Sequence, residues 1–441
     1  MILYIPKALK PYLTFQYSVL NETFFKNVYK LEPGHYLKYK DNNLEIKPYY
    51  EAKFDSKEKN FDDYMKDIQI CVEDSVKYHK ISDVKVGSFL SGGIDSSYIT
   101  RCLMPNKTFS VGFANKGFSE VDDAKELSKL LDIENVNKTI LPDEFFKEIK
   151  NVQYHSDEPH ANLSAVPLYF LSKLAREHVT VVLSGEGADE LFGGYTSYGV
   201  TEIEANYRKI PKFIRKGIGN LANHFPKFHG RNFLVKNGMD IEDYYIGQAY
   251  IFDEKEASAI VKPDYRNSKT VKEITKPYFD RVRDKDEVTK MQFLDMHLWL
   301  PNDILLKADK MTMAHSLELR VPFLDKEVMS LASKIPTKYK ISHNTTKYIL
   351  RKTANKVLPD EWAKRPKIGF PVPFYQWIKD EKYYKKIKLV FMKNYVKKFF
   401  DQDAVLKLLE EHYSNKKNNG RKLWTIYAFL LWYQVYFIDE K

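Results

Sequence analysis

The chain has 441 residues, of which 44% are hydrophobic and 29% charged, as in an ordinary globular protein of two or three domains. Its two cysteines, Cys71 and Cys102, stand in unrelated contexts, which excludes a disulfide framework and favours a reducing, cytoplasmic compartment. The net charge of +11 comes from scattered lysines and indicates a basic surface rather than nucleic-acid binding. The longest apolar stretch, 423–438, is shorter than the roughly 18 residues of a membrane span, so we expect a buried helix and no membrane contact.

Strand and turn signals fill residues 1–56. The alternation in 13–17 predicts a strand, and a Pro-Gly turn within 32–39 leads into another. Asp41-Asn42-Asn43 predicts a hairpin turn before the strand at 44–46. This segment is too small and open to be a complete domain, so we expect the end of one.

Strand and helix signals alternate after the polar linker at 55–60. We predict helices at about 61–78, 121–131 and 168–177, and strands at 84–90, 108–113 and 179–183. Near-continuous apolar strands separated by helices indicate an α/β fold with a parallel sheet flanked by helices. Beyond about residue 196 the chain is predicted to be mainly helical.

A glycine-rich turn, Ser91-Gly92-Gly93-Ile94-Asp95-Ser96-Ser97, joins the strand at 84–90 to a helix beginning near Ser96. The glycines let backbone amides approach an anion, and a helix amino end favours phosphate. Asp95 suits such a site when it holds a metal ion that bridges to the phosphates. A simple serine-glycine helix cap is the alternative, but the preceding strand and the Asp-Ser-Ser sequence favour phosphate binding.

A second turn of this kind spans 184–195, after the strand at 179–183. Glu186, Asp189 and Glu190 lie within five residues and suit metal binding and proton abstraction. The structural alternative is a helix start with acidic residues in its first turn.

Further motifs lie at 306–314, 318–325, 347–351 and 365–370. With the two turns, and in this order, they resemble the synthetase domain of glutamine-dependent asparagine synthetases over essentially the whole chain. The resemblance implies the N-type ATP pyrophosphatase fold, which is like that of the adenine nucleotide α-hydrolases. It also implies a synthetase domain at 57–441, with an ATP-pyrophosphatase core at 57–200 and a helical part at 201–441 that completes the active site.

The resemblance implies that aspartate and ATP form β-aspartyl-AMP and pyrophosphate, and that ammonia then gives asparagine and AMP. Glu186 matches the carboxylate that manages the proton of the incoming amine, and Lys367 matches the lysine that stabilises charge on the phosphates. Asp95 and Asp189 match the Mg²⁺ ligands. The implied ATP-binding residues are Leu90, Ser91, Gly92, Gly93, Asp95, Ser96, Val111, Ser184 and Gly185. Arg320 and Lys347 are expected to be structural or to support the residues that touch the substrate.

The chain departs from this family at its start. A glutaminase domain of the family begins with a catalytic cysteine after the initiator methionine, where this chain has Ile2. Residues 1–56 resemble only the closing strands of that Ntn-type domain, and Cys71 and Cys102 lie in the synthetase part. We therefore expect no glutamine hydrolysis. Nitrogen would come as free ammonia or from a separate glutaminase subunit docked on these strands, which could otherwise pair in a homodimer.

Three other functions stay open from the sequence. The same adenylation could act on another carboxylate, as in relatives that close a β-lactam ring, macrocyclise a peptide or amidate a sugar. A tRNA-modifying enzyme with the same phosphate loop would need a zinc-ligand set or a basic recognition arm, and neither is visible. A non-catalytic remnant would have lost some of the motif residues that are present here: Ser91, Asp95, Glu186, Asp189 and Lys367.

Overall fold

A five-stranded sheet lies at the centre of the computed structural model, which describes residues 6–115, 117–226, 228–365 and 369–439. Its strands run in the order β5-β4-β3-β6-β7, and every neighbouring pair is parallel. Val86 of β3 pairs with Val181 of β6, and Ser88 pairs with Thr108 of β4. The predicted parallel sheet is confirmed. The strands are β3 (Val86–Phe89), β4 (Lys107–Phe113), β5 (Glu134–Ile140), β6 (Val181–Leu183) and β7 (Glu318–Arg320).

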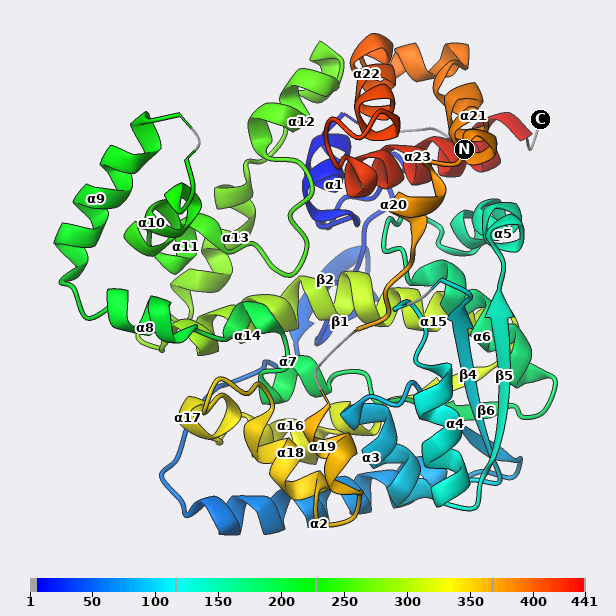
Figure 1. Cartoon of the computed structure of the whole chain (residues 1–441), viewed down its shortest axis with the longest axis vertical. Helices are drawn as coiled ribbons and strands as arrows, with labels where there is room; N and C mark the ends of the chain where they lie inside the picture. Colours follow the sequence, from blue (N-terminus) through cyan, green and yellow to red (C-terminus); the bar gives the residue numbers. More distant parts are fainter. Residues whose placement is uncertain (1–5, 116, 227, 366–368, 440–441) are drawn as a thin grey trace.

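Helices cover both faces of this sheet, which explains why β3, β4 and β6 are buried along most of their length. Two hydrophobic clusters lie on opposite faces. One joins the inner sides of α3 and α4 to Leu90 and Leu183, and the other joins α6 and α15 to Phe109 and Val182 (Figure 1). The helices of this half are α2 (Phe61–Lys80), α3 (Ile94–Leu103), α4 (Val121–Leu130), α5 (Pro142–His155), α6 (Ala165–Arg176) and α7 (Ala188–Phe192).

The chain beyond residue 196 is mainly helical, as predicted, and β7 is the one named strand among its described residues. The helices there are α8 (Glu202–Tyr207), α9 (Lys212–His224), α10 (Arg231–Gly238), α11 (Ile241–Tyr244), α12 (Glu254–Ile260), α13 (Val271–Asp280), α14 (Glu287–His297), α15 (Leu306–Met313), α16 (Lys326–Ala332), α17 (Thr337–Lys340), α18 (Tyr348–Ala354), α19 (Asp360–Lys364), α20 (Phe374–Trp377), α21 (Glu381–Phe391), α22 (Gln402–Tyr413) and α23 (Gly420–Gln434).

The strand predicted at 13–17 is wrong, because these residues belong to helix α1 (Leu9–Phe15) and the turn after it. All seven residues of α1 are buried, so the hydrophobic core surrounds the helix. A helix without a solvent-exposed face lacks the one-sided apolar pattern by which a sequence indicates a helix. The Tyr12 hydroxyl donates to the carbonyl of Thr425 in α23 at 2.9 Å. Phe24 packs edge-on against Trp432 with ring centroids 5.3 Å apart. Residues 8–24 therefore share one core with the C-terminal helix.

The predicted hairpin is confirmed as β1 (His35–Lys40) and β2 (Asn43–Pro48), paired antiparallel. Asp41 and Asn42 both have positive φ, 50° and 59°, as the turns that suit two-residue hairpins require. The hairpin packs little, since Leu37 is 50% exposed and Leu44 60% exposed.

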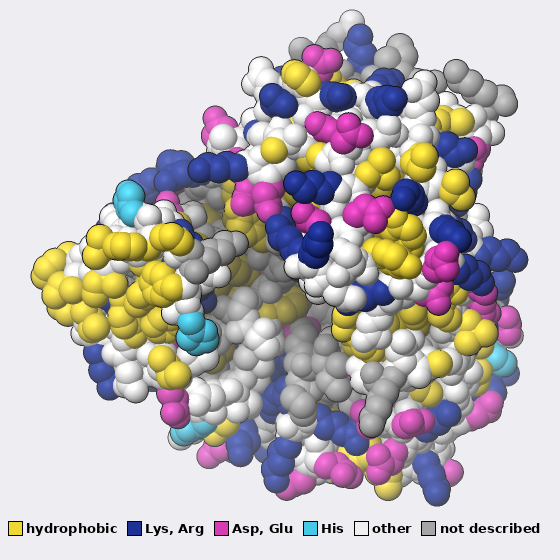
Figure 2. Space-filling view, turned by 45° about the horizontal axis from the view of Figure 1, so that its top comes forward, with side chains coloured by type: hydrophobic (Ala, Val, Ile, Leu, Met, Phe, Trp, Pro, Cys, Tyr) yellow, Lys and Arg dark blue, Asp and Glu magenta, His cyan; other side chains and the backbone are white. Residues whose placement is uncertain are grey.

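Helices α8 to α10 form a lobe that stands away from the sheet, on the left in Figure 1. Helices α9 and α10 pack closely where two glycines face each other. A Cβ at Gly219 would lie only 3.1 Å from the Cα of Gly238, so a larger residue would force the helices apart. Hydrophobic side chains gather on the outside of this lobe (Figure 2), among them Phe213, Leu221 and Phe225.

The apolar segment near the C-terminus is the buried helix that the sequence predicts. Among the described residues, no helix combines the length and the apolar composition needed to cross a membrane. Trp424 and Trp432 of α23 are almost fully buried.

Substitutions on α1 and on the hairpin distinguish these two parts of the first 56 residues. Leu13 is fully buried, so Leu13→Ala is expected to lower the free energy of unfolding by about 2 to 5 kcal/mol. Leu44→Ala on the exposed hairpin is the control and is expected to change it by less than about 0.5 kcal/mol. Urea denaturation followed by tryptophan fluorescence measures both. Equal effects would contradict a shared core between α1 and α23.

Candidate active site

The first glycine-rich turn leaves the end of β3 and enters α3 at Ile94. Gly92 has φ +79°, and a Cβ there would lie 2.6 Å from the Cβ of Asp123, so only glycine fits. The Ser91 amide donates to the Ser96 hydroxyl at 3.2 Å, and the Gly93 amide donates to the Ser91 hydroxyl at 3.3 Å. These bonds hold a compact loop in front of a helix amino end, where an anion is favoured.

The second turn leaves β6 and enters α7. Because β3 and β6 are parallel neighbours, the two turns emerge at the same edge of the sheet. They touch at Gly185, where a Cβ would lie 2.7 Å from the carbonyl carbon of Asp95 and the nitrogen of Ser96. The close approach explains why glycine follows Ser184.

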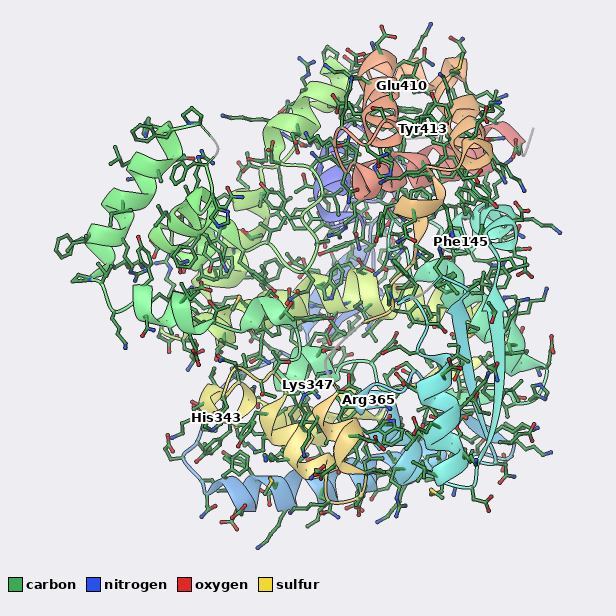
Figure 3. All side chains as sticks on the ribbon, in the orientation of Figure 1. Phe145, His343, Lys347, Arg365, Glu410 and Tyr413 are labelled. Atoms are coloured by element: carbon green, nitrogen blue, oxygen red, sulfur yellow. The ribbon has the colours of Figure 1, made fainter. Side chains whose placement is uncertain are left out.

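Lys347 joins the two turns. Its ammonium forms ion pairs with Asp95 and with Asp189, the latter at 2.8 Å, although the side chain comes from the start of α18. Burial opposes the charge, but Asp189 and Asp95 outweigh it and hold the pKa of Lys347 above its usual value. The sequence suggested that Lys347 is structural or supports residues that touch the substrate. It lies between the two predicted metal ligands, which agrees with the second of these roles, and Figure 3 shows it near the middle of the molecule.

A cavity of about 550 Å³ lies over this edge of the sheet. Most of the predicted residues line it: Leu90, Ser91, Gly93, Asp95, Ser96, Val111, Ser184, Gly185, Glu186 and Asp189. Gly92 packs behind the loop against Asp123. The Leu90 amide donates to the Phe109 carbonyl at 2.9 Å, and its carbonyl accepts from the Ser110 hydroxyl at 2.6 Å. Lys367 lies outside the described residues.

Glu186 lies in the cavity wall with a buried carboxylate oxygen, Oε2, that has no hydrogen-bond partner in the described part of the chain. Burial raises the pKa of this carboxyl, and the nearby positive charge of Lys307 partly offsets the effect. An unpaired, buried carboxyl at the meeting point of two turns is typical of functional sites.

Four further cations line the cavity: Lys307, Arg351, Arg365 and Arg421. The first three stand in motifs that the sequence singled out, but the sequence assigned them no role, and Arg421 was missed because it comes from a distant segment. Arg351 donates to the carbonyls of Ala363 at 2.9 Å and Arg365 at 2.7 Å. It thereby fixes the backbone that leads into the segment 366–368. Arg365, labelled in Figure 3, stacks over Trp362 at 4.3 Å and pairs with Asp123 at 3.0 Å.

Arg320 lies outside this group, as expected. Its guanidinium donates to the carbonyls of His79 and Ile81, each at 2.7 Å, and so ties strand β7 to the end of α2.

Within the described residues, no group of three or more histidine, cysteine or acidic side chains is arranged to hold a metal ion. The acidic pair Asp95 and Asp189 nevertheless converges on one cation, the Lys347 ammonium. The pair could therefore supply two oxygen ligands to a divalent ion whose remaining ligands are phosphate oxygens and water.

The parallel sheet, the strand-turn-helix phosphate loop and the second acidic turn define an α/β protein of the N-type ATP pyrophosphatase fold class. The family description "Asparagine synthase" matches residues 67–434. The chain belongs to the asparagine synthase family.

Individual relatives agree with this assignment. The chain is 42% identical to glutamine-hydrolysing asparagine synthetase 1 of Bacillus subtilis (strain 168), over 97% of this chain and 68% of that protein. It is 26% identical to glutamine-hydrolysing asparagine synthetase 3 of the same organism, over 79% of this chain and 55% of that protein. It is also 23% identical to amidase chry2 of Gibberella zeae, over 82% of this chain and 61% of that protein.

The contact between the two turns gives a test of the site. Gly185→Ala must push Asp95 and Ser96 away, so we expect a loss of about 1 to 3 kcal/mol in stability and at least a tenfold weaker affinity for pyrophosphate. Calorimetry of pyrophosphate binding and thermal unfolding measure these effects. Gly217→Ala in α9, where a Cβ meets nothing within 4 Å, is the control and should leave pyrophosphate binding unchanged. Unaltered binding by Gly185→Ala would contradict the assigned contact.

Proposed function

We propose that the chain activates aspartate with ATP, giving β-aspartyl-AMP and pyrophosphate, and then converts the adenylate with ammonia to asparagine and AMP. The observation that carries this proposal is the meeting of the two turns. Asp95 from one turn and Asp189 from the other both pair with the Lys347 ammonium, and Glu186 lies in the same cavity.

In this proposal the phosphate loop binds the β and γ phosphates and later the pyrophosphate. The amides of the first turn of α3 have no partners within the helix, and the glycine backbone leaves room for an anion above them. The hydroxyls of Ser91 and Ser96 lie 3.1 Å apart and would donate to phosphate oxygens. The adenosine part would pack against a second group of residues on the neighbouring strands: Leu90, Val111, Ser184 and Gly185.

A Mg²⁺ ion fits the donor set, because Asp95 and Asp189 already face one positive charge in common. When bound with ATP, the ion would neutralise phosphate charge and polarise the phosphate oxygens. Carboxylate oxygens are the ligands that Mg²⁺ prefers, and the two side chains come from turns that lie in contact.

Glu186 is proposed to hold the incoming ammonia and to take its proton. Its buried, unpartnered oxygen gives an acceptor on the cavity wall, and burial raises its pKa in the direction a general base requires. Lys367, which is outside the described residues, is proposed to stabilise charge on the phosphates. Arg351 supports this role because it anchors the backbone just before that segment.

The source of nitrogen is a separate part of the proposal. The chain spans 68% of a relative whose name states glutamine hydrolysis, and its two cysteines are the half-buried Cys71 and Cys102. Burial raises the pKa of Cys102 to about 12, which disfavours a thiolate nucleophile. We propose that ammonia arrives free or from a separate glutaminase subunit or a second copy of the chain docked on the exposed β1–β2 hairpin. The free thiols also favour the cytoplasm as the compartment.

An exchange assay tests the activation step. Radiolabelled pyrophosphate should enter ATP only when aspartate is present, and ammonia, but not glutamine, should then give asparagine. Glu186→Gln removes the base and is expected to lower asparagine formation by about 10²-fold or more. Glu202→Gln on the exposed side of α8 is the control and should retain full activity. Exchange that does not depend on aspartate would refute the proposed substrate.

Magnesium dependence tests the acidic pair. Lys347→Met leaves Asp95 and Asp189 facing each other without their shared cation, so we expect a lower melting temperature in magnesium-free buffer and a larger rise on adding Mg²⁺ than in the wild type. Lys340→Met is a matched control, since Lys340 is equally buried, at 2% exposure, but contacts Gln292 rather than a carboxylate. An equal Mg²⁺ response in Lys347→Met and the wild type would argue against metal binding by this pair.

A further inference from the structure

One wall of the cavity is formed by a continuous chain of hydrogen bonds between side chains from four separate segments of the chain. At one end Arg421 of α23 donates to the side-chain oxygen Oε1 of Gln16 at 3.1 Å, and Nε2 of Gln16 donates to Asp303 at 2.7 Å. From the other side Asn162 donates to Asp303 at 2.6 Å and accepts from the Ser164 hydroxyl at 2.7 Å. The far end is Lys307 of α15, which donates to Ser164 at 3.0 Å. A cation therefore terminates the chain at each end.

Asp303 anchors the centre of this chain. Its side chain is fully buried, and one of its oxygens lies 3.2 Å from Nε2 of His160. Burial alone would raise the pKa of Asp303, but His160, Lys307 and Gln16 outweigh it and hold the pKa below its usual value. The carboxylate thus stays charged and fixes the amides of Gln16 and Asn162 in one orientation.

The two terminal cations have room for an anionic ligand. Lys307 is 8% exposed, yet its hydrogen bond goes to a neutral hydroxyl, and the described residues offer it no ion pair. Arg421 lines the same cavity, donates to a neutral amide and likewise has no ion pair within the described chain. Burial lowers the pKa of Arg421, which reflects the cost of keeping this charge away from water. A carboxylate at each end would offset that cost.

These two cations are distinct from those that face the phosphate loop. Lys347 and Arg351 are near Asp95 and Asp189, whereas Lys307 acts on Glu186. Glu186 is the group proposed above to hold the ammonia that attacks the activated carboxylate. The wall from Lys307 to Arg421 therefore faces the substrate that is not the nucleotide.

We propose that this wall is the binding site for the dicarboxylic amino acid, and that Arg421 selects for the carboxylate that does not react. The proposal rests on the function proposed above. Arg421 binds the α-carboxylate through its planar fork of donors, and Lys307 orients the reacting carboxylate beside Glu186. Asp303 is a positioning residue that acts through Gln16 and Asn162.

The proposal makes a specific prediction about two substrates that differ by one group. β-Alanine equals aspartate without its α-carboxylate, so both present the same carboxylate for activation. Arg421→Gln removes the proposed charged hydrogen bonds between the guanidinium and the α-carboxylate. This change is expected to raise the KM for aspartate about 10- to 100-fold in the pyrophosphate exchange assay. The KM for ATP should stay within about twofold, because a selective loss is expected of a residue that contacts only the amino acid. The preference for aspartate over β-alanine should fall by the same factor as the aspartate KM rises.

Lys307 gives the complementary result. Lys307→Met is expected to lower exchange with aspartate and with β-alanine by similar factors, since both need the reacting carboxylate to be oriented. Each variant has a matched control on its own helix. Lys422 pairs with Glu256 and Lys310 pairs with Asp157 at 2.6 Å, so Lys422→Gln and Lys310→Gln should leave both substrates unaffected.

Two outcomes separate this inference from the proposed function. Wild-type protein without aspartate-dependent exchange would refute the function itself. Normal exchange, with an unchanged aspartate KM and an unchanged substrate preference in Arg421→Gln, would overturn the inference and leave the function in place. Thermal unfolding verifies that the variants fold. If Arg421→Gln does not fold, Arg421→Lys, which keeps the charge but loses the fork, must still weaken the preference for aspartate for the proposal to hold.

Discussion

The ion pairs of Lys347 with Asp95 and Asp189 hold the site together. Each partner comes from a different segment: a turn after β3, a turn after β6, and the start of α18. Because two carboxylates at neighbouring helix starts repel each other, the two turns require a cation to stay in contact at Gly185. Through the same ion pairs, α18 of the helical part of the chain contacts the phosphate loop directly. The cavity between them is a consequence of that contact.

The sheet could be predicted where its signal is local. Strands β3, β4 and β6 are short apolar runs of the kind that parallel sheets bury, and β3 and β6 end in glycine-rich turns. Strand β5 escaped prediction because its residues Glu134, Asn135 and Asn137 are polar, as the edge of a sheet permits. Strand β7 has only three residues and forms through its pairing with β6. Helix α1 was misread because it is surrounded by core, a fact that its own sequence does not contain.

The acidic half of the site was visible in the sequence, and the basic half was not. Glu186 and Asp189 stand in one turn, and Asp95 stands in a turn of the same kind, so their chemistry could be inferred from spacing. Lys307 stands in the 306–314 motif, which indicated the family but no role for this lysine, and nothing near Arg421 in the chain marks a ligand site. Their positions depend on how α15 and α23 pack, which is decided by hydrophobic contacts remote from the cavity.

The bond between Gln16 and Arg421 joins positions 405 residues apart, so the wall that it completes is the last part of the cavity that folding can assemble. During synthesis the phosphate loop and its strands leave the ribosome hundreds of residues before α23. Until α23 has been synthesised, the apolar surface of α1 lacks the helix against which it packs, and exposed apolar surface favours aggregation. Long-range closure of this kind is slow. The protein's yield in a cell therefore depends on how α1 is shielded until the C-terminal helix arrives, which makes this helix a determinant of folding as well as of the active site.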